Sequence, residues 1–113
     1  MVTKGVAKLI YIAKGKRENG SPVELETFRN VRVDITKTFS SRYYFERGRD
    51  MRDAMNIRIP KYLVDDIHID CNVYRLMYAE VYGVRFMVAE VLNDWTNFKD
   101  NHNFKVLDLK KVI

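Results

Sequence analysis

Residues 31–36 read Val-Arg-Val-Asp-Ile-Thr, and this stretch decides the fold class. Its apolar side chains share one side of an extended chain and its polar ones share the other: Val31, Val33 and Ile35 against Arg32, Asp34 and Thr36. A period of two residues is typical of a half-buried β-strand. The pattern predicts a strand within residues 24–39. Since Leu25 and Phe28 fall on opposite parities, we expect a bulge or bend near residues 29–30.

Strand and turn signals continue on both sides of this stretch. The Asn-Gly pair in residues 18–22, Glu-Asn-Gly-Ser-Pro, predicts a hairpin turn, because it supplies positive φ angles. A second turn is expected at Gly83, and Pro60 should end a strand because proline cannot donate to the ladder. The remaining predicted strands cover residues 8–14, 55–59, 67–73, 76–81, 84–92 and 104–109.

The predicted elements add up to a mostly β protein with about six to seven short strands. Residues 40–50 could form one short helix capped by Ser40 or Ser41 and ended by Gly48, or an extended loop. We see no linker and no repeat, and predict one domain over residues 1–113. The expected fold is a small single-domain antiparallel β-barrel or sandwich with a long loop.

Charge is distributed unevenly along the chain, whose formal net charge is +5. Residues 29–61 hold nine basic and four acidic side chains, whereas residues 62–113 hold six and eight. Such asymmetry suits contact with nucleic acid or head-to-tail contact between copies of one protein.

Chemical motifs are sparse, so we expect no enzyme, no cofactor and no metal site. His68 and His102 are the only histidines, and the nearest approach to a metal cluster is a loose set of Asp65, Asp66, His68, Asp70 and Cys71. The single cysteine excludes an internal disulfide, and Cys71 is predicted to be a small core thiol. We expect neither a signal peptide nor a membrane-spanning segment.

A basic and aromatic segment within residues 38–53 is the strongest positive signal. Its side chains are Arg42, Tyr43, Tyr44, Phe45, Arg47, Arg49 and Arg52. Tyrosine and arginine are favoured at protein interfaces, and aromatic stacking with arginine is also what single-strand nucleic-acid binders use. A solvated face with one or two core aromatics would produce the same composition. Trp95 is predicted to be a core anchor beneath a polar loop at residues 93–103.

The order of these features resembles the small head-closure proteins of tailed bacteriophages, also called head–tail connector, adaptor or stopper proteins. The resemblance covers nearly the whole chain. It is carried by the Gly- and Pro-containing turn at residues 18–22, the strand 31–35, the Ser-rich entry to residues 40–46 with the alternating strand 55–59, and the Gly turn with its aromatic–aliphatic row at residues 82–88.

The resemblance implies a virion structural protein of the head–tail junction, found in the host cytoplasm during assembly. Such proteins are monomeric alone and form a ring below the portal or its adaptor. The ring closes the DNA channel after packaging and offers a docking surface for tail proteins. The loop at residues 38–53 would line that channel and meet packaged DNA without reading its sequence. Two alternatives stay open: a tail-completion or terminator ring protein, and a small single-stranded nucleic-acid-binding β-barrel.

Overall fold

The computed structural model describes residues 3–36, 54–96 and 99–112, and every structural statement below refers to these ranges. The described residues form seven strands and one 3-10 helix, with these bounds: β1 Thr3–Lys16, β2 Pro22–Thr36, β3 Ala54–Pro60, η2 Lys61–Val64, β4 Ile67–Ile69, β5 Asn72–Val81, β6 Val84–Thr96 and β7 Lys99–Lys111. No helix within them is long and apolar enough to cross a membrane.

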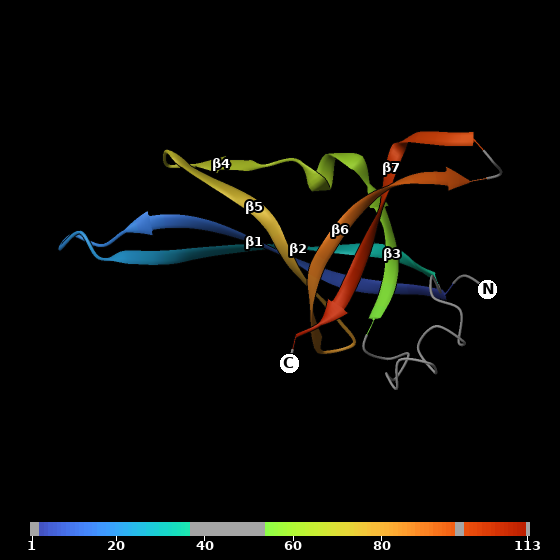
Figure 1. Cartoon of the computed structure of the whole chain (residues 1–113), viewed down its shortest axis with the longest axis horizontal. Coiled ribbons are helices and arrows are strands. Elements are labelled where there is room, and N and C mark those ends of the chain that lie inside the picture. Colours follow the sequence, from blue (N-terminus) through green and yellow to red (C-terminus); the bar gives the residue numbers. More distant parts are fainter. Residues whose placement is uncertain (1–2, 37–53, 97–98, 113) are drawn as a thin grey trace.

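Six of the strands close into an antiparallel barrel (Figure 1). The order runs β1-β2-β3-β7-β6-β5, and β5 returns to pair with β1. The short strand β4 is added to β5 as a hairpin outside this circuit. The predicted mostly β barrel is therefore confirmed.

The barrel consists of two well-paired ribbons joined by two short seams. One ribbon is β4-β5-β1-β2 and the other is β3-β7-β6. Strand β2 pairs with β3 only from Asp34 to Thr36, and β5 pairs with β6 only from Tyr78 to Val81. Away from these seams the ribbons diverge, so the molecule combines a closed barrel with the splayed edges of a sandwich (Figure 1).

Alternate side chains of the strands fill the barrel, as a period of two residues requires. The fully buried core includes Leu9, Tyr11, Ile57, Ile59, Phe86, Leu107 and Leu109. Helix η2 adds the buried Leu63, and the Tyr11 hydroxyl donates a hydrogen bond to the Leu63 carbonyl oxygen. Burial raises the pKa of the Tyr11 hydroxyl, and the nearby Arg29 guanidinium opposes this shift.

The β2 prediction was right about its inward face and wrong about a bulge. Val33 is buried, and Val31 and Ile35 pack against the core as predicted. Strand β2 nevertheless pairs with β1 without any register shift, because Phe28 points outward and is 52% exposed. The register shift in this ribbon lies in the β1–β5 pairing, between Ile10 and Tyr11. Strand β1 is also longer than predicted, and β2 begins two residues earlier than predicted.

Residues 67–73 were predicted to be one strand and instead contain a two-residue hairpin turn. Asp70 and Cys71 both have positive φ, 48° and 65°, which reverses the chain between β4 and β5. Cys71 is consequently exposed at the tip, so its prediction as a core thiol is wrong. The predicted turn at Gly83 is confirmed, with Tyr82 and Gly83 both at positive φ.

The polar stretch 93–103 is mostly strand rather than loop. Strand β6 continues to Thr96 and β7 begins at Lys99. Trp95 is 63% exposed, so it is not the core anchor that its sequence context predicted. The helical alternative for residues 40–50 lies outside the described residues.

Candidate interaction surface

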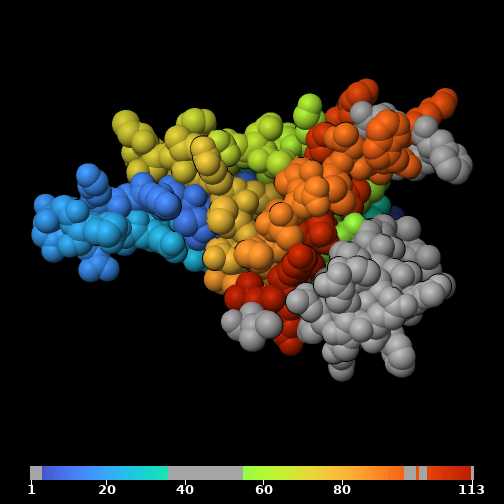
Figure 2. Space-filling model, in the orientation of Figure 1, coloured from blue at the N-terminus to red at the C-terminus, as the bar shows by residue number. Residues whose placement is uncertain are grey.

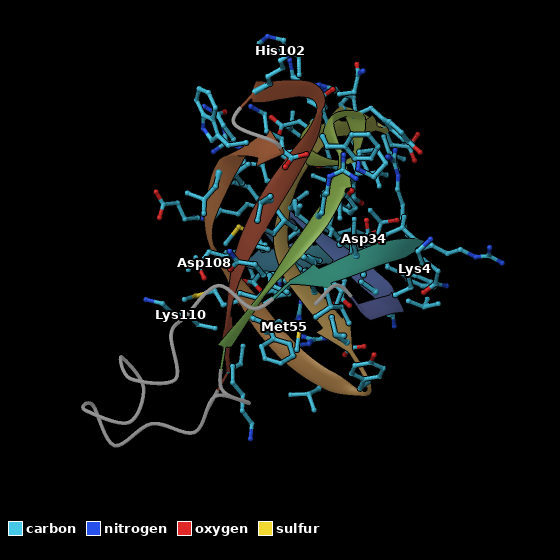
Figure 3. All side chains as sticks on the ribbon, turned by 90° about the vertical axis from the view of Figure 1, so that its right-hand side faces the viewer. Lys4, Asp34, Met55, His102, Asp108 and Lys110 are labelled. Carbon is cyan, nitrogen blue, oxygen red and sulfur yellow. The ribbon has the colours of Figure 1, made fainter. Side chains whose placement is uncertain are left out.

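The site residues predicted from the sequence lie outside the described part of the chain: Arg42, Tyr43, Tyr44, Phe45, Arg47, Arg49 and Arg52. Strands β2 and β3 flank them. Thr36 at the end of β2 is the cross-strand partner of Asn56 near the start of β3. The end of β2 and the start of β3 therefore lie at one rim of the barrel, where Asp108 and Lys110 of β7 also lie (Figure 3).

Asp108 at this rim is a partly buried carboxyl group on the outer side of β7. Burial raises its pKa, the Lys110 ammonium lowers it, and the Glu90 carboxylate raises it further. Its strand neighbour Asn56 is buried as well. Both side chains have interaction partners, so the rim is a packed polar surface.

The β1–β2 hairpin projects from the barrel as an arm (Figures 1 and 2). Strand β1 pairs with β5 only from Ala7 to Ile12, whereas its pairing with β2 continues to Lys16. Beyond Ile12, no described strand other than β1 and β2 themselves pairs with the hairpin. Its turn is closed by backbone hydrogen bonds between Arg17 and Ser21 and between Gly20 and Arg17, each 2.8 Å long.

Strand β2 has one long edge that no described strand covers. It pairs with β1 along its whole length, but β3 covers the opposite edge only from Asp34 onward. The uncovered edge runs from Pro22 to Val33. Unpaired backbone N–H and C=O groups on a strand edge are able to pair with another extended chain, so this edge is a candidate for strand addition.

A polar groove opens where β2 separates from β3. Arg58 of β3 organises it: its Nε donates to Asp94 Oδ2 at 2.7 Å, and its Nη1 lies 3.6 Å from Asp34 Oδ2. The guanidinium carbon is also 3.7 Å from the centroid of the Phe104 ring. Asp94 is buried although it is charged, and the arginine neutralises it.

This groove has a volume of about 450 Å³ and is bordered by further basic side chains. Lys4 and Arg32 line it beside Val6, and Lys4 is the cross-strand neighbour of Asp34 (Figure 3). Among the described residues, no ion pair involves Lys4 or Arg32. The groove can therefore accept an anionic group at its open side.

A charge network covers the outer side of β1 and β5 on another part of the barrel. Arg85 Nη2 lies 3.3 Å from Glu80 Oε1 and 3.8 Å from Glu26 Oε1. Lys8 Nζ lies 4.0 Å from Glu80 Oε2 and 4.3 Å from the centroid of the Phe28 ring. Ile10 lies on the same side of the sheet, between its cross-strand partners Phe28 and Tyr78. It is fully buried.

The candidate catalytic and metal-ligating residues are not brought together. His68 and His102 are both exposed, and they come from β4 and β7. Asp65 and Asp66 are exposed between η2 and β4. The described residues contain no group of three or more side chains placed to hold a metal ion. The described surface instead offers one uncovered strand edge and a groove bordered by charged side chains.

A scan against protein-family models, a search of curated proteins and a search of solved structures each found no match to this chain. Fold and surface define its class: a small antiparallel β-barrel with a projecting hairpin arm and one long uncovered strand edge.

Proposed function

We propose that the protein is a structural component of the head–tail junction of a tailed bacteriophage, a head-closure or stopper protein. It assembles as a ring below the portal or adaptor, closes the DNA channel after packaging and provides the docking surface for the tail. It acts without a cofactor and without catalysis. Its place is the virion, reached from the host cytoplasm.

The observation that carries this proposal is the arm. The part of the hairpin past Ile12 forms no backbone ladder with β5, so it extends beyond the closed circuit of strands. It is well placed to reach another subunit. Arms with free strand edges join subunits by strand addition, in which backbone hydrogen bonds provide affinity and side chains provide specificity.

The position of the basic segment supports the same function. Residues 38–53 are rich in arginine, and the strands that flank this segment, β2 and β3, pair with each other at one barrel rim. In a ring of subunits, equivalent rims face the same direction, so the segments would gather around a common opening. Packaged DNA in that opening would meet arginine side chains that bind phosphates without reading bases.

Electron microscopy of the protein mixed with purified portal or adaptor rings tests the proposal. We expect ring-shaped density added to the lower face of the portal complex. A tail-completion or terminator protein of the same junction would instead decorate isolated tails, so tails are examined in parallel. If neither portal complexes nor tails are decorated at any protein excess, the junction assignment is wrong.

A second candidate function, binding of single-stranded nucleic acid, is favoured by the groove at Arg58. Lys4 and Arg32 could contact phosphates there, next to the aromatic ring of Phe104. Oligonucleotide titration at several salt concentrations separates the two functions. Micromolar or tighter binding with a steep salt dependence, lost when Tyr43, Tyr44 and Arg47 are replaced by Ala, would favour the nucleic-acid barrel. Weak binding that is unaffected by these changes supports the junction protein.

A further inference from the structure

We infer that the uncovered edge of β2 pairs with the β2 edge of a second copy of this chain, antiparallel and around a two-fold axis at Phe28. This goes beyond the proposed ring, because a two-fold contact uses the same surface twice and closes on itself. The dimer would be the form of the protein before assembly. It replaces the monomer that the family resemblance implies, and ring formation would release the paired edges.

The extent of the uncovered edge points to this axis. The free positions that can enter a ladder run from Val23 to Val33, and Phe28 is the midpoint of that range. On one side, Asp34 is already paired with Arg58 of β3. On the other side, Pro22 has no N–H group to donate. With Phe28 on the axis, Pro22 of each copy lies opposite Asp34 of the other. The new ladder therefore ends at the same point on both strands.

The side chains match across the same axis. In a two-fold antiparallel pair, residues equally far from the axis on either side face each other on one side of the sheet. Glu24 therefore faces Arg32 of the second copy, and Glu26 faces Asn30. On the other side of the sheet, Leu25 faces Val31 and Val23 faces Val33. Each contact occurs twice, and no like charges meet.

Neighbouring positions of the axis match less well. An axis at Glu26 brings the Glu26 carboxylates of the two copies together. An axis at Thr27 places Leu25 opposite Arg29 of the second copy. An axis at Arg29 brings two guanidinium groups together. An axis at Asn30 shortens the ladder to residues 27–33, because Asp34 is already paired with β3. The side-chain pattern of β2 and the limits of its free edge thus select Phe28 from five candidate positions.

Phe28 itself is suited to such a contact. Its ring is 52% exposed in the single chain, on the outer side of β2 beside Lys8. Two such rings meeting on the axis would remove apolar surface from water at the centre of the contact, where interface energy concentrates. Without a partner, the same long and partly apolar edge would be an aggregation site.

Analytical ultracentrifugation of the full chain tests the dimer and its axis. We expect a species of twice the 13.4 kDa chain mass, converted to monomer by Glu24→Arg or by Arg32→Glu alone. The double variant restores opposite charges across the axis and should dimerise again. The matched control Glu18→Arg changes an exposed turn residue outside the paired range and should leave the dimer intact. Far-ultraviolet circular dichroism checks that every variant is folded.

Oxidative crosslinking locates the axis independently. Residues facing each other across a ladder have Cα atoms roughly 4.5–5.5 Å apart, within disulfide range. In a Cys71→Ser background, Phe28→Cys should form a covalent dimer on oxidation, whereas Asn30→Cys should not. A wild-type chain that stays monomeric over the whole dilution series, or a dimer unaffected by the charge variants, overturns the inference. Neither result bears on portal decoration, so the two proposals fail separately.

Discussion

Tyr11 shows how one polar atom is accommodated inside a small apolar barrel. Its ring is fully buried among the inward side chains of β1, and its hydroxyl reaches the carbonyl of Leu63 in η2. A carbonyl in that position would otherwise lie buried without a partner, which is costly. The hydrogen bond therefore fixes η2 against the end of the barrel.

Replacing Tyr11 by Phe removes this hydrogen bond while keeping the ring. We expect the free energy of unfolding to fall by about 1–2 kcal/mol, because the Leu63 carbonyl loses its donor. Urea denaturation followed by circular dichroism measures the change. Tyr82→Phe is the control, since Tyr82 is 69% exposed, and it should change stability little. Equal effects of the two variants would contradict the proposed role of the Tyr11 hydroxyl.

The pH dependence of stability should carry a signature of the same residue. Burial raises the pKa of Tyr11 above its usual 10.0, so the folded chain holds this proton more tightly than the unfolded chain. The corresponding stability is complete below the unfolded pKa and is lost as the pH rises through the folded one. We expect wild-type stability to fall more steeply above pH 10 than that of Tyr11→Phe, as measured by urea denaturation across the alkaline range.

Arg58 is the second residue on which a local structure depends. Arg58→Ala leaves the buried Asp94 carboxylate without its guanidinium, and we expect about 2 kcal/mol of destabilisation in denaturant unfolding. Arg75→Ala is a matched control, because Arg75 is largely exposed and lies 3.8 Å from Asp66. That surface pair should contribute well under about 1 kcal/mol. A similar loss in both variants would mean that burial of Asp94 does not matter.

Among the structural elements, the hairpin turns store identifiable backbone strain. Cys71 has a φ of 65°, a conformation in which glycine is favoured because it has no Cβ. Cys71→Gly should therefore raise the free energy of unfolding by about 0.5–1 kcal/mol, seen as a higher melting temperature. Cys71→Ala keeps a Cβ and should bring no such gain. If both variants melt alike, the strain at this turn is negligible.

The sequence predicted strands well where one side of the strand is buried. Alternation identified the inward side chains of β2 and β3, including Val33, Ile57 and Ile59. It also located the Gly83 turn, because glycine at positive φ is a strong local signal. The Asp70–Cys71 turn was not predicted, because neither of its two residues is glycine or asparagine, the residues that usually signal positive φ.

Features that depend on distant parts of the chain could not be predicted. The length of the arm was underestimated because Lys14, Lys16 and Glu24 face solvent and carry no burial pattern. Trp95 was assigned to the core because large aromatic residues usually lie there, yet the extension of β6 leaves it exposed. The edge of β2 is uncovered because β3 pairs with it only from Asp34 to Thr36. A pairing between distant strands is not encoded in the local sequence pattern of β2.

At the scale of the whole molecule, the arm should be separable from the barrel. The described residues span 51 × 33 × 19 Å, and the arm forms much of the long dimension (Figure 2). Replacing residues 15–23 by Asn-Gly joins Lys14 to its cross-strand partner Glu24 through a two-residue turn. We expect a folded chain with a melting temperature near that of the wild type and no decoration of portal rings. A shortened chain that still assembles would show that the arm is not the subunit contact.

The pairing of β1 with β5 has a consequence for how the chain folds. The ribbons contain hairpins between sequence neighbours, such as β1–β2 and β6–β7, which form early because they close short loops. The β1–β5 pairing, in contrast, joins residues far apart in the chain, such as Ala7 and Val81. Loop-closure entropy makes such contacts slow to form. Formation of the β1–β5 pairing should therefore limit the refolding rate, and the amides of this pairing should be among the last to become protected from hydrogen exchange.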